Sequence, residues 1–250
     1  MAAPDGGRRG GARIEDPAPP RALLVMGEAL ANLVTLTLRH GRFETRTSTD
    51  TADCQRLVAD WKPHLAMIDL DRYERFLAML ANGPTPILVF TRKREASVKL
   101  SAFEMGADDI VEVPFTLDEI VARPFALMRR SHGVTVPLVP KIRLDGLEVD
   151  VITQKVRVNG DELSLSPIQQ ALLYLLAANA GRVLSREEML TTIWGADFET
   201  ESNVVDRHIR ELRVKLKDDW RTPRYIETVA GAGYRFKPQD GNGVSQVAAG

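Results

Sequence analysis

The stretch from Glu201 to Lys217, ESNVVDRHIRELRVKLK, constrains the fold of this chain more than any other. Its apolar residues recur at spacings of four, three and four, so one face of a helix carries Val205, Ile209, Leu212 and Leu216. The opposite face carries Asn203, Arg207, Arg210 and Val214, and five basic residues stand against two acidic ones between positions 203 and 217. The first face suits a small core. The second is either a solvated surface or a face that enters a DNA major groove.

The residues after this helix favour a face that enters a DNA major groove over a solvated surface. The sequence from Tyr225 to Lys237, YIETVAGAGYRFK, predicts two strands joined by a glycine-rich turn. A helix with one basic face, followed by such a hairpin, is typical of the C-terminal part of a winged helix-turn-helix. We therefore expect a nucleic-acid-binding unit in this part of the chain.

Length and composition set the outer limits. A chain of 250 residues predicts one or two domains, and a net charge of −1 gives no overall field that would attract nucleic acid or a membrane. No apolar run is long enough to predict a membrane span. The single Cys54 excludes an internal disulfide and fits a reducing cytoplasm. Residues 1–20 are rich in Gly, Pro, Ala and Arg and lack a signal-peptide core, so we expect them to be disordered.

Short apolar segments alternate with helical patterns through the first half of the chain. Segments of strand character cover residues 22–26, 43–47, 65–68, 87–90 and 110–113. This alternation predicts an α/β domain over residues 21–130, with five parallel strands in a (βα)5 order and helices on both faces of the sheet. Functional groups of such sheets lie at the carboxyl ends of the strands, where Asp69 and Thr91 fall.

Residues 21–130 resemble the receiver domain of bacterial two-component response regulators through PHLAMIDL, EMGADDIVEVPF and the order of strands and helices. The resemblance places Asp69 at the phospho-acceptor position and Thr91 at the position of the switch hydroxyl. Two features depart from the family pattern. Met26 and Gly27 replace the acidic pair that holds Mg²⁺, and Val113 replaces the lysine before the Pro-Phe pair.

These departures remove groups that phosphoryl transfer needs. A metal ion and a cation normally neutralise the charge that develops when a phosphoryl group meets a carboxylate. Loss of one preorganised donor typically costs about 10²- to 10³-fold in rate. The sequence therefore predicts a receiver-like domain without a metal or cofactor and without phosphate on Asp69. Two alternatives stay open: phosphorylation of Asp69 with Glu28 holding the metal, and control by a protein or small ligand in the pocket around Met26, Asp69 and Thr91.

The same resemblance implies a homodimer. In the subgroup with a winged helix, the fourth helix, fifth strand and fifth helix pair two receivers through salt bridges. The matching positions hold three pairs of opposite charge: Lys99 and Glu119, Asp109 and Arg123, and Asp108 and Arg130. Exposed ion pairs contribute about 0–1 kcal/mol each, so the pattern of three pairs favours a dimer more than any single pair does. Pro124 falls inside the expected fifth helix and predicts a kink there.

The second half begins with an expected linker over residues 131–140, which contain two prolines and a glycine. Short strands at 141–144, 147–151 and 155–158 precede helices that begin after Ser166 and Ser185. The segments LSLSPIQQALLYLLAANAGRVLSREEMLTTIWG, NVVDRHIRELRVKL and YIETVAGAGYRF closely resemble the effector domain of OmpR/PhoB-type regulators over residues 141–237. This likeness implies an α+β winged helix-turn-helix domain. Residues 238–250 are expected to form a disordered tail.

By that likeness, the helix around residues 203–217 enters the major groove and the hairpin lies along the neighbouring minor groove. Arg207 and Arg210 are the first candidates for base contacts, and Asn203 and His208 are the second. His208 could equally pack against the edge of the core. Phosphate contacts are expected from Arg213, Lys215, Arg224, Thr228, Arg235 and Lys237.

Basic and acidic residues balance over positions 141–237, so a single copy is expected to bind DNA weakly and with a steep salt dependence. A dimer would bind two half-sites at once, and the two weak contacts would combine into a useful affinity. Ala230 stands where the family often has a minor-groove arginine, and Glu211 stands where a basic residue is frequent. The sequence thus predicts a cytoplasmic bacterial transcription regulator of promoter DNA, not an enzyme, with RNA polymerase as a further partner. It needs neither a cofactor nor a cognate histidine kinase.

Overall fold

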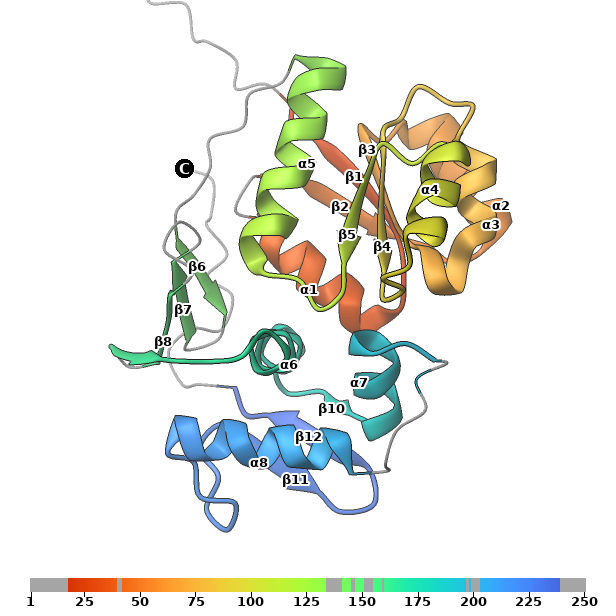
Figure 1. Ribbon diagram of the computed structural model, residues 1–250. Helices are drawn as coiled ribbons and strands as arrows, with labels where there is room; N and C mark the ends of the chain where they lie inside the picture. Colours follow the sequence, from red (N-terminus) through yellow and green to blue (C-terminus); the bar gives the residue numbers. More distant parts are fainter. Residues whose placement is uncertain are drawn as a thin grey trace, which may run out of the picture.

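The structure is a computed structural model, and it describes residues 18–39, 42–133, 141–144, 147–150, 155–158, 160–196, 198 and 203–238. The segments expected to be disordered, 1–20 and 238–250, and the expected linker, 131–140, lie largely outside these residues. Helices and strands form an N-terminal and a C-terminal domain (Figure 1). In the described part of the chain, no helix is long and apolar enough to cross a membrane.

The N-terminal domain is the predicted five-stranded parallel sheet with helices on both faces. The strands are β1 (Arg21–Val25), β2 (Glu44–Thr47), β3 (Leu65–Asp69), β4 (Ile87–Thr91) and β5 (Asp109–Glu112), in the order β2-β1-β3-β4-β5. The helices are α1 (Glu28–Arg39), α2 (Thr51–Arg56) with a π-helical turn at Leu57–Trp61, α3 (Leu70–Leu80), α4 (Ala96–Glu104) and α5 (Leu117–His132). The helix α5 includes Pro124 and continues two residues past the expected boundary at Arg130.

Alternating side chains of the buried strands supply two cores, one on each face of this sheet. Leu24, Met67 and Phe90 point toward α1 and α5, whereas Val25, Ile68 and Val89 point toward α2, α3 and α4. Strands buried on both faces are expected to be apolar throughout, which is why β1, β3 and β4 appear in the sequence as continuous apolar runs. The polar side chains are left to the strand ends, and this arrangement positions Asp69 and Thr91.

The C-terminal domain is a winged helix. Four short antiparallel strands come first: β6 (Lys141–Leu144), β7 (Leu147–Asp150), β8 (Lys155–Val158) and β9 (Asp161–Leu163). They are followed by α6 (Pro167–Ala178), β10 (Val183–Leu184), α7 (Arg186–Ile193) and α8 (Val204–Leu216), and then by the hairpin of β11 (Ile226–Val229) and β12 (Gly233–Phe236). The sequence analysis did not predict β9 or β10. The strand β10 pairs with β12, and only glycine fits at position 233, where a Cβ would lie 2.0 Å from the carbonyl oxygen of Leu184.

The two domains share one hydrophobic core. Helix α1 of the N-terminal domain packs on α6 of the C-terminal domain, and one cluster of buried residues runs from Ala29 and Leu33 into α6 (Figure 1). The buried Asn179 reinforces this junction, because its Nδ2 donates to the carbonyl oxygen of Ala29 at 3.1 Å. Its Oδ1 accepts from Asn32 Nδ2 at 2.8 Å. A buried amide that finds partners in the other domain fixes the relative position of the two units.

Candidate DNA interface and N-terminal pocket

Helix α8 presents one open face, and the helix lies at the end of the C-terminal domain that is away from the N-terminal domain (Figure 1). Asn203, Arg207, Arg210 and Val214 are exposed, while Val205, Ile209, Leu212 and Leu216 are buried in the core. Val214 is 75% exposed, so the open face carries an apolar methyl surface as well as charge. Such a face can offer hydrogen-bond donors to guanine and apolar contact to thymine methyl groups.

A polar network sets the position of α8 against α7 and the hairpin. Asp206 on α8 accepts from Arg186 Nε at 2.8 Å and from the hydroxyl of Tyr234 in β12. Burial raises the pKa of Tyr234 above its ordinary value, and the hydrogen bond to Asp206 raises it further, so Tyr234 stays a donor at neutral pH. The guanidinium of Arg186 also lies 4.9 Å from the centre of the Tyr234 ring.

Asp218 joins the end of α8 to the hairpin. This buried carboxylate accepts from the backbone N–H groups of Arg224, Tyr225 and Ile226 at 2.6, 3.2 and 2.8 Å. Three charge-assisted bonds from consecutive residues hold the start of β11 in one position. The sequence analysis did not single out Asp218, because its partners are backbone groups that a sequence pattern does not reveal.

Most residues expected to meet phosphate also have partners inside the domain. Arg213 donates to the carbonyl oxygen of Ile226 and to the Thr228 hydroxyl, and Arg235 pairs with Glu227 at 2.6 Å. Lys215 donates to Gln169 Oε1 at 2.7 Å, and Lys237 to the carbonyl oxygen of Pro223 at 2.9 Å. Arg224, Thr228 and Ala230 are exposed along the hairpin and the loop before it. These interactions hold most of the cationic side chains close to the surface of the domain.

His208 lies at the edge of the core rather than on the open face of α8. Its side chain is 13% exposed, and its ring stacks on Trp194 at a centroid distance of 5.8 Å. Glu211 accepts from Gln169 Nε2 at 2.9 Å, and this hydrogen bond lowers the pKa of Glu211 below its ordinary value. Glu211 also lies 3.4 Å from His208 Nδ1. Glu211 is thus tied to α6, a partner that the sequence analysis did not name.

A buried ion pair occupies the carboxyl end of the N-terminal sheet. Arg92, the first residue after β4, contacts Asp69 Oδ1 through its Nη1, and both side chains are 3% exposed. Burial raises the pKa of Asp69 above its ordinary value, while the charge and hydrogen bond of Arg92 act in the opposite direction. A neighbouring cation therefore stabilises the carboxylate form of Asp69 at the position where the sequence placed a phospho-acceptor.

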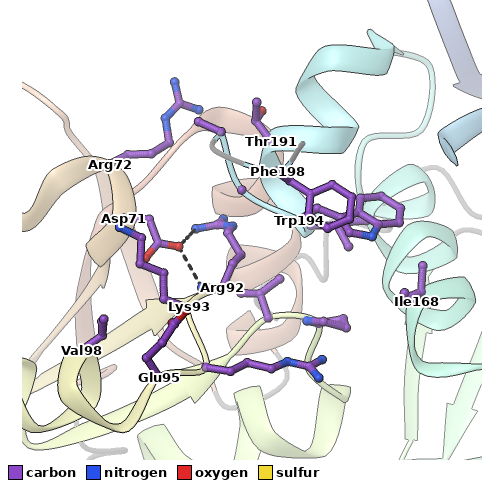
Figure 2. Close-up of a pocket in the computed structure, with 16 residues that line it drawn as sticks. Asp71, Arg72, Arg92, Lys93, Glu95, Val98, Ile168, Thr191, Trp194 and Phe198 are labelled. Carbon is purple, nitrogen blue, oxygen red and sulfur yellow. Dashed lines mark hydrogen bonds and ion pairs between the residues drawn. The ribbon is translucent and has the colours of Figure 1, made fainter. Parts of the chain in front are cut away.

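Asp71 is the third member of this cluster and binds both the hydroxyl of Thr91 and the backbone of Arg92. Thr91 Oγ1 donates to Asp71 Oδ1 at 2.7 Å, and the backbone N–H of Arg92 donates to Asp71 Oδ2 at 2.8 Å. The same Oδ2 lies 3.3 Å from Arg92 Nη1 (Figure 2). One guanidinium thus contacts two carboxylates, and the Thr91 hydroxyl gives Asp71 a further hydrogen-bond donor.

The pocket does not fit the Mg²⁺ ion that the sequence resemblance implies. Met26 is buried without charge, and a Cβ added at Gly27 would lie 3.6 Å from Arg72 Nη1. The carboxylate of Glu28 is 71% exposed and lies 3.6 Å from Arg182 of the C-terminal domain. Among the residues that the structure describes, no three His, Cys, Asp or Glu side chains converge on one point. Cationic side chains stand where a divalent cation would need carboxylates.

Arg92 also reaches the C-terminal domain. Its Nε donates to the carbonyl oxygen of Thr192 in α7 at 2.8 Å, so one side chain bonds to Asp69, Asp71 and the neighbouring domain. The sequence analysis missed Arg92, Asp71 and Arg72. The signal was present in the segments Asp69-Leu-Asp-Arg72 and Thr91-Arg-Lys-Arg94, which place charged residues directly after two neighbouring buried strands.

The expected dimer residues gather on α4, β5 and α5, and several pair within one chain. Lys99 contacts Glu112, and Arg123 lies 3.1 Å from Asp109 and 3.3 Å from Glu119. The carboxylate of Asp108 accepts from the backbone N–H of Ile87 at 2.7 Å, and Arg130 is exposed. Helix α4 also exposes two large apolar side chains that the sequence analysis did not name, Leu100 at 62% and Phe103 at 47%.

Comparison with known proteins matches residues 160–236 to the family described as "Transcriptional regulatory protein, C terminal". Transcriptional regulatory protein KdpE of Mycobacterium tuberculosis is 32% identical over 209 residues, which cover 82% of this chain and 92% of KdpE. Response regulator ArlR of Staphylococcus aureus is 35% identical over 210 residues, covering 82% and 93%. The solved DNA-binding domain of Klebsiella pneumoniae RstA, in complex with the RstA box, is 31% identical and covers 40% of this chain and all of that chain, with a TM-score of 0.37.

Replacing Arg92 with Met should lower the free energy of unfolding by about 3–5 kcal/mol, because it leaves buried carboxylates without their cation. Arg94→Met is the matched control, since Arg94 lies on the same loop and is exposed. Urea denaturation of the full chain measures both changes. Adding Asp69→Asn to Arg92→Met should recover part of the loss, because one unpaired charge is then removed. Equal losses for Arg92→Met and Arg94→Met would show that the ion pair contributes nothing.

Proposed function

Because this chain belongs to the OmpR/PhoB-type response regulators and is a DNA-binding transcription regulator, we propose that it acts as a homodimer and without phosphorylation of Asp69. The buried pair of Asp69 with Arg92 is the observation that carries this proposal. Promoter DNA is its partner, and RNA polymerase is the further partner of a regulator of this kind.

The chemistry of the pocket supports the absence of a phosphorylation switch. A phosphodonor must reach a carboxylate oxygen of Asp69, but Asp69 is 2% exposed and its Oδ1 is held by Arg92. A divalent cation would also have to enter beside the guanidinium groups of Arg72 and Arg92, and the like charges repel it. Arg92 thus holds one oxygen of the carboxylate that would act as nucleophile, and Arg72 lies beside Gly27, where the family has a metal ligand.

The open face of α8 supports the DNA-binding geometry that we propose. Asn203, Arg207 and Arg210 are exposed on α8, and α8 itself lies at the end of the C-terminal domain away from the N-terminal domain (Figure 1). In this proposal the two arginines contact base edges and Asn203 adds a further contact near the start of the helix. His208, at the edge of the core, orients Trp194 and α8. Backbone phosphates are met by Arg213, Lys215, Arg224, Thr228, Arg235 and Lys237.

The surface of α4, β5 and α5 supports the dimer. In the proposed interface, Phe103 and Leu100 form the apolar centre, and the rim consists of the charged residues Lys99, Asp108, Asp109, Glu119, Arg123 and Arg130. An apolar centre with a charged rim is typical of protein interfaces. Because the charges of the C-terminal domain balance, pairing of two weak half-sites gives the dimer its useful affinity.

Asp69→Ala should bind genomic promoter fragments with the same affinity as the wild type, when both are purified without a phosphodonor. Arg210→Ala should weaken binding by roughly tenfold or more, because one base contact contributes about 1–3 kcal/mol. Trp220→Ala, an exposed change outside the proposed base contacts, is the control. Gel-shift titrations over a salt series measure all four proteins. DNA binding by the wild type that appears only after addition of a phosphodonor would contradict the proposed independence.

Phe103→Glu should convert the dimer to a monomer, because it places a charge in the apolar centre of the proposed interface. Sedimentation velocity over a range of protein concentrations is the measurement. Val214→Glu introduces the same charge on an exposed apolar residue of the other domain, and it should leave the dimer intact. If Phe103→Glu sedimented as the wild type does, the dimer would have to use another surface.

A further inference from the structure

A cavity of about 700 Å³ lies between the two domains, beside the Asp69–Arg92 pair. Its walls come from the loops after β3 and β4 on one side, and from α7 and the segment after it on the other (Figure 2). Val113, which stands where the family keeps a lysine, forms part of an apolar wall. Small-molecule sites commonly have this size and lie at domain interfaces.

The wall from the N-terminal domain is rich in cations. Arg72, Arg92, Lys93 and Arg94 line the cavity, against the two acids Asp71 and Glu95. Asp71 is bound by Thr91 and Arg92, and Asp69 also pairs with Arg92, so the four cations exceed the three nearby carboxylates by one charge. Arg94 is exposed and has no hydrogen bond or ion pair with any residue in the described part of the chain. The net positive charge of this wall favours an anion as the occupant. Guanidinium groups bind carboxylates and phosphates through two parallel hydrogen bonds.

The wall from the C-terminal domain is aromatic. Trp194 and Phe198 lie next to each other in the cavity, with ring centroids 6.2 Å apart and planes inclined by 34° (Figure 2). Phe198 is 41% exposed, although a phenyl ring gains by being covered. Ile168 of α6 adds apolar surface on the same side, and Val98 of α4 belongs to the wall from the N-terminal domain. This wall suits a flat ring that stacks against aromatic side chains.

Arg92 supplies an independent observation. Its side chain is 3% exposed and lines the cavity, and its Nη1 and Nε have partners, but its Nη2 is buried without a hydrogen-bond partner. A buried donor without an acceptor costs about 1–3 kcal/mol, so few persist in folded proteins without a reason. An anion bound against Arg92 would supply the acceptor.

From these observations we infer that the cavity between the domains binds a small organic anion whose apolar part is a flat ring. The anionic group contacts Arg92 and Arg94, and the ring packs on Trp194 and Phe198. The occupant touches both domains and lies next to Asp69, so it replaces phosphate as the signal at this position. Its role as a signal rests on the proposed function, whereas its binding does not.

Isothermal titration of the full-length protein with three probes tests the inference. The probe 1-naphthoate carries both a ring and a carboxylate, 1-naphthalenemethanol carries the ring without charge, and inorganic phosphate carries charge without a ring. We expect 1-naphthoate to bind once per chain and the other two at least about tenfold more weakly, which corresponds to about 1.4 kcal/mol. Equal binding of the three probes, or no saturable binding of 1-naphthoate, would overturn the inference.

Variants locate the binding. Arg94→Gln and Phe198→Ala should each weaken 1-naphthoate binding by about tenfold, or about 1.4 kcal/mol. Phe198→Tyr keeps the aromatic ring and should bind 1-naphthoate as the wild type does. Arg129→Gln, an exposed arginine on α5 away from the cavity, is the control and should bind as the wild type does. Binding that is unchanged in both Arg94→Gln and Phe198→Ala would place the probe elsewhere and contradict the assignment. DNA binding is measured separately, so loss of the proposed function would leave this result standing.

Discussion

The buried ion pair between Arg92 and Asp69 is the interaction on which this account depends. A carboxylate at the end of β3 is removed from water, and burial alone would favour its neutral form. Arg92 provides the compensating charge from the end of the neighbouring strand, and it binds Asp71 with the same guanidinium. The position that the family uses for a transient, metal-assisted chemical change thus holds a permanent contact between side chains of one chain.

That contact extends beyond the pocket, because Arg92 also donates to Thr192 in the C-terminal domain. The shared core of α1 and α6, together with Asn179, holds the domains at a second point. In this arrangement α8 lies at the end of the molecule away from the N-terminal domain (Figure 1). In the proposed function, the N-terminal domain is a fixed support and a pairing surface, and DNA binding does not wait for its release. A ligand in the cavity between the domains would act beside the contact of Arg92 with Thr192, one of the points that join them.

The sequence was sufficient for the parts of the fold that depend on local pattern. Continuous apolar runs identified β1, β3 and β4, and the periodicity of Val205, Ile209, Leu212 and Leu216 identified α8 and its buried face. The short strands β9 and β10 escaped prediction, because two or three residues carry no periodic signal and depend on their partners. Departures at Met26, Gly27 and Val113 predicted the loss of groups that phosphoryl transfer needs, but they did not predict that Arg92 lies beside Asp69. Pairing of Arg92 with Asp69 joins positions 23 residues apart, and only the parallel register of β3 and β4 brings them together.

The most direct test of the central claim is the intact mass of the purified protein after incubation with acetyl phosphate and Mg²⁺. If Arg92 holds Asp69 as described, the mass of the wild type should stay unchanged, as should that of Asp69→Ala. A response regulator with a known phospho-acceptor, treated in the same way, confirms that the reagent is active. A gain of one phosphoryl group by the wild type, and not by Asp69→Ala, would show that the pocket still performs phosphoryl transfer and would contradict the account.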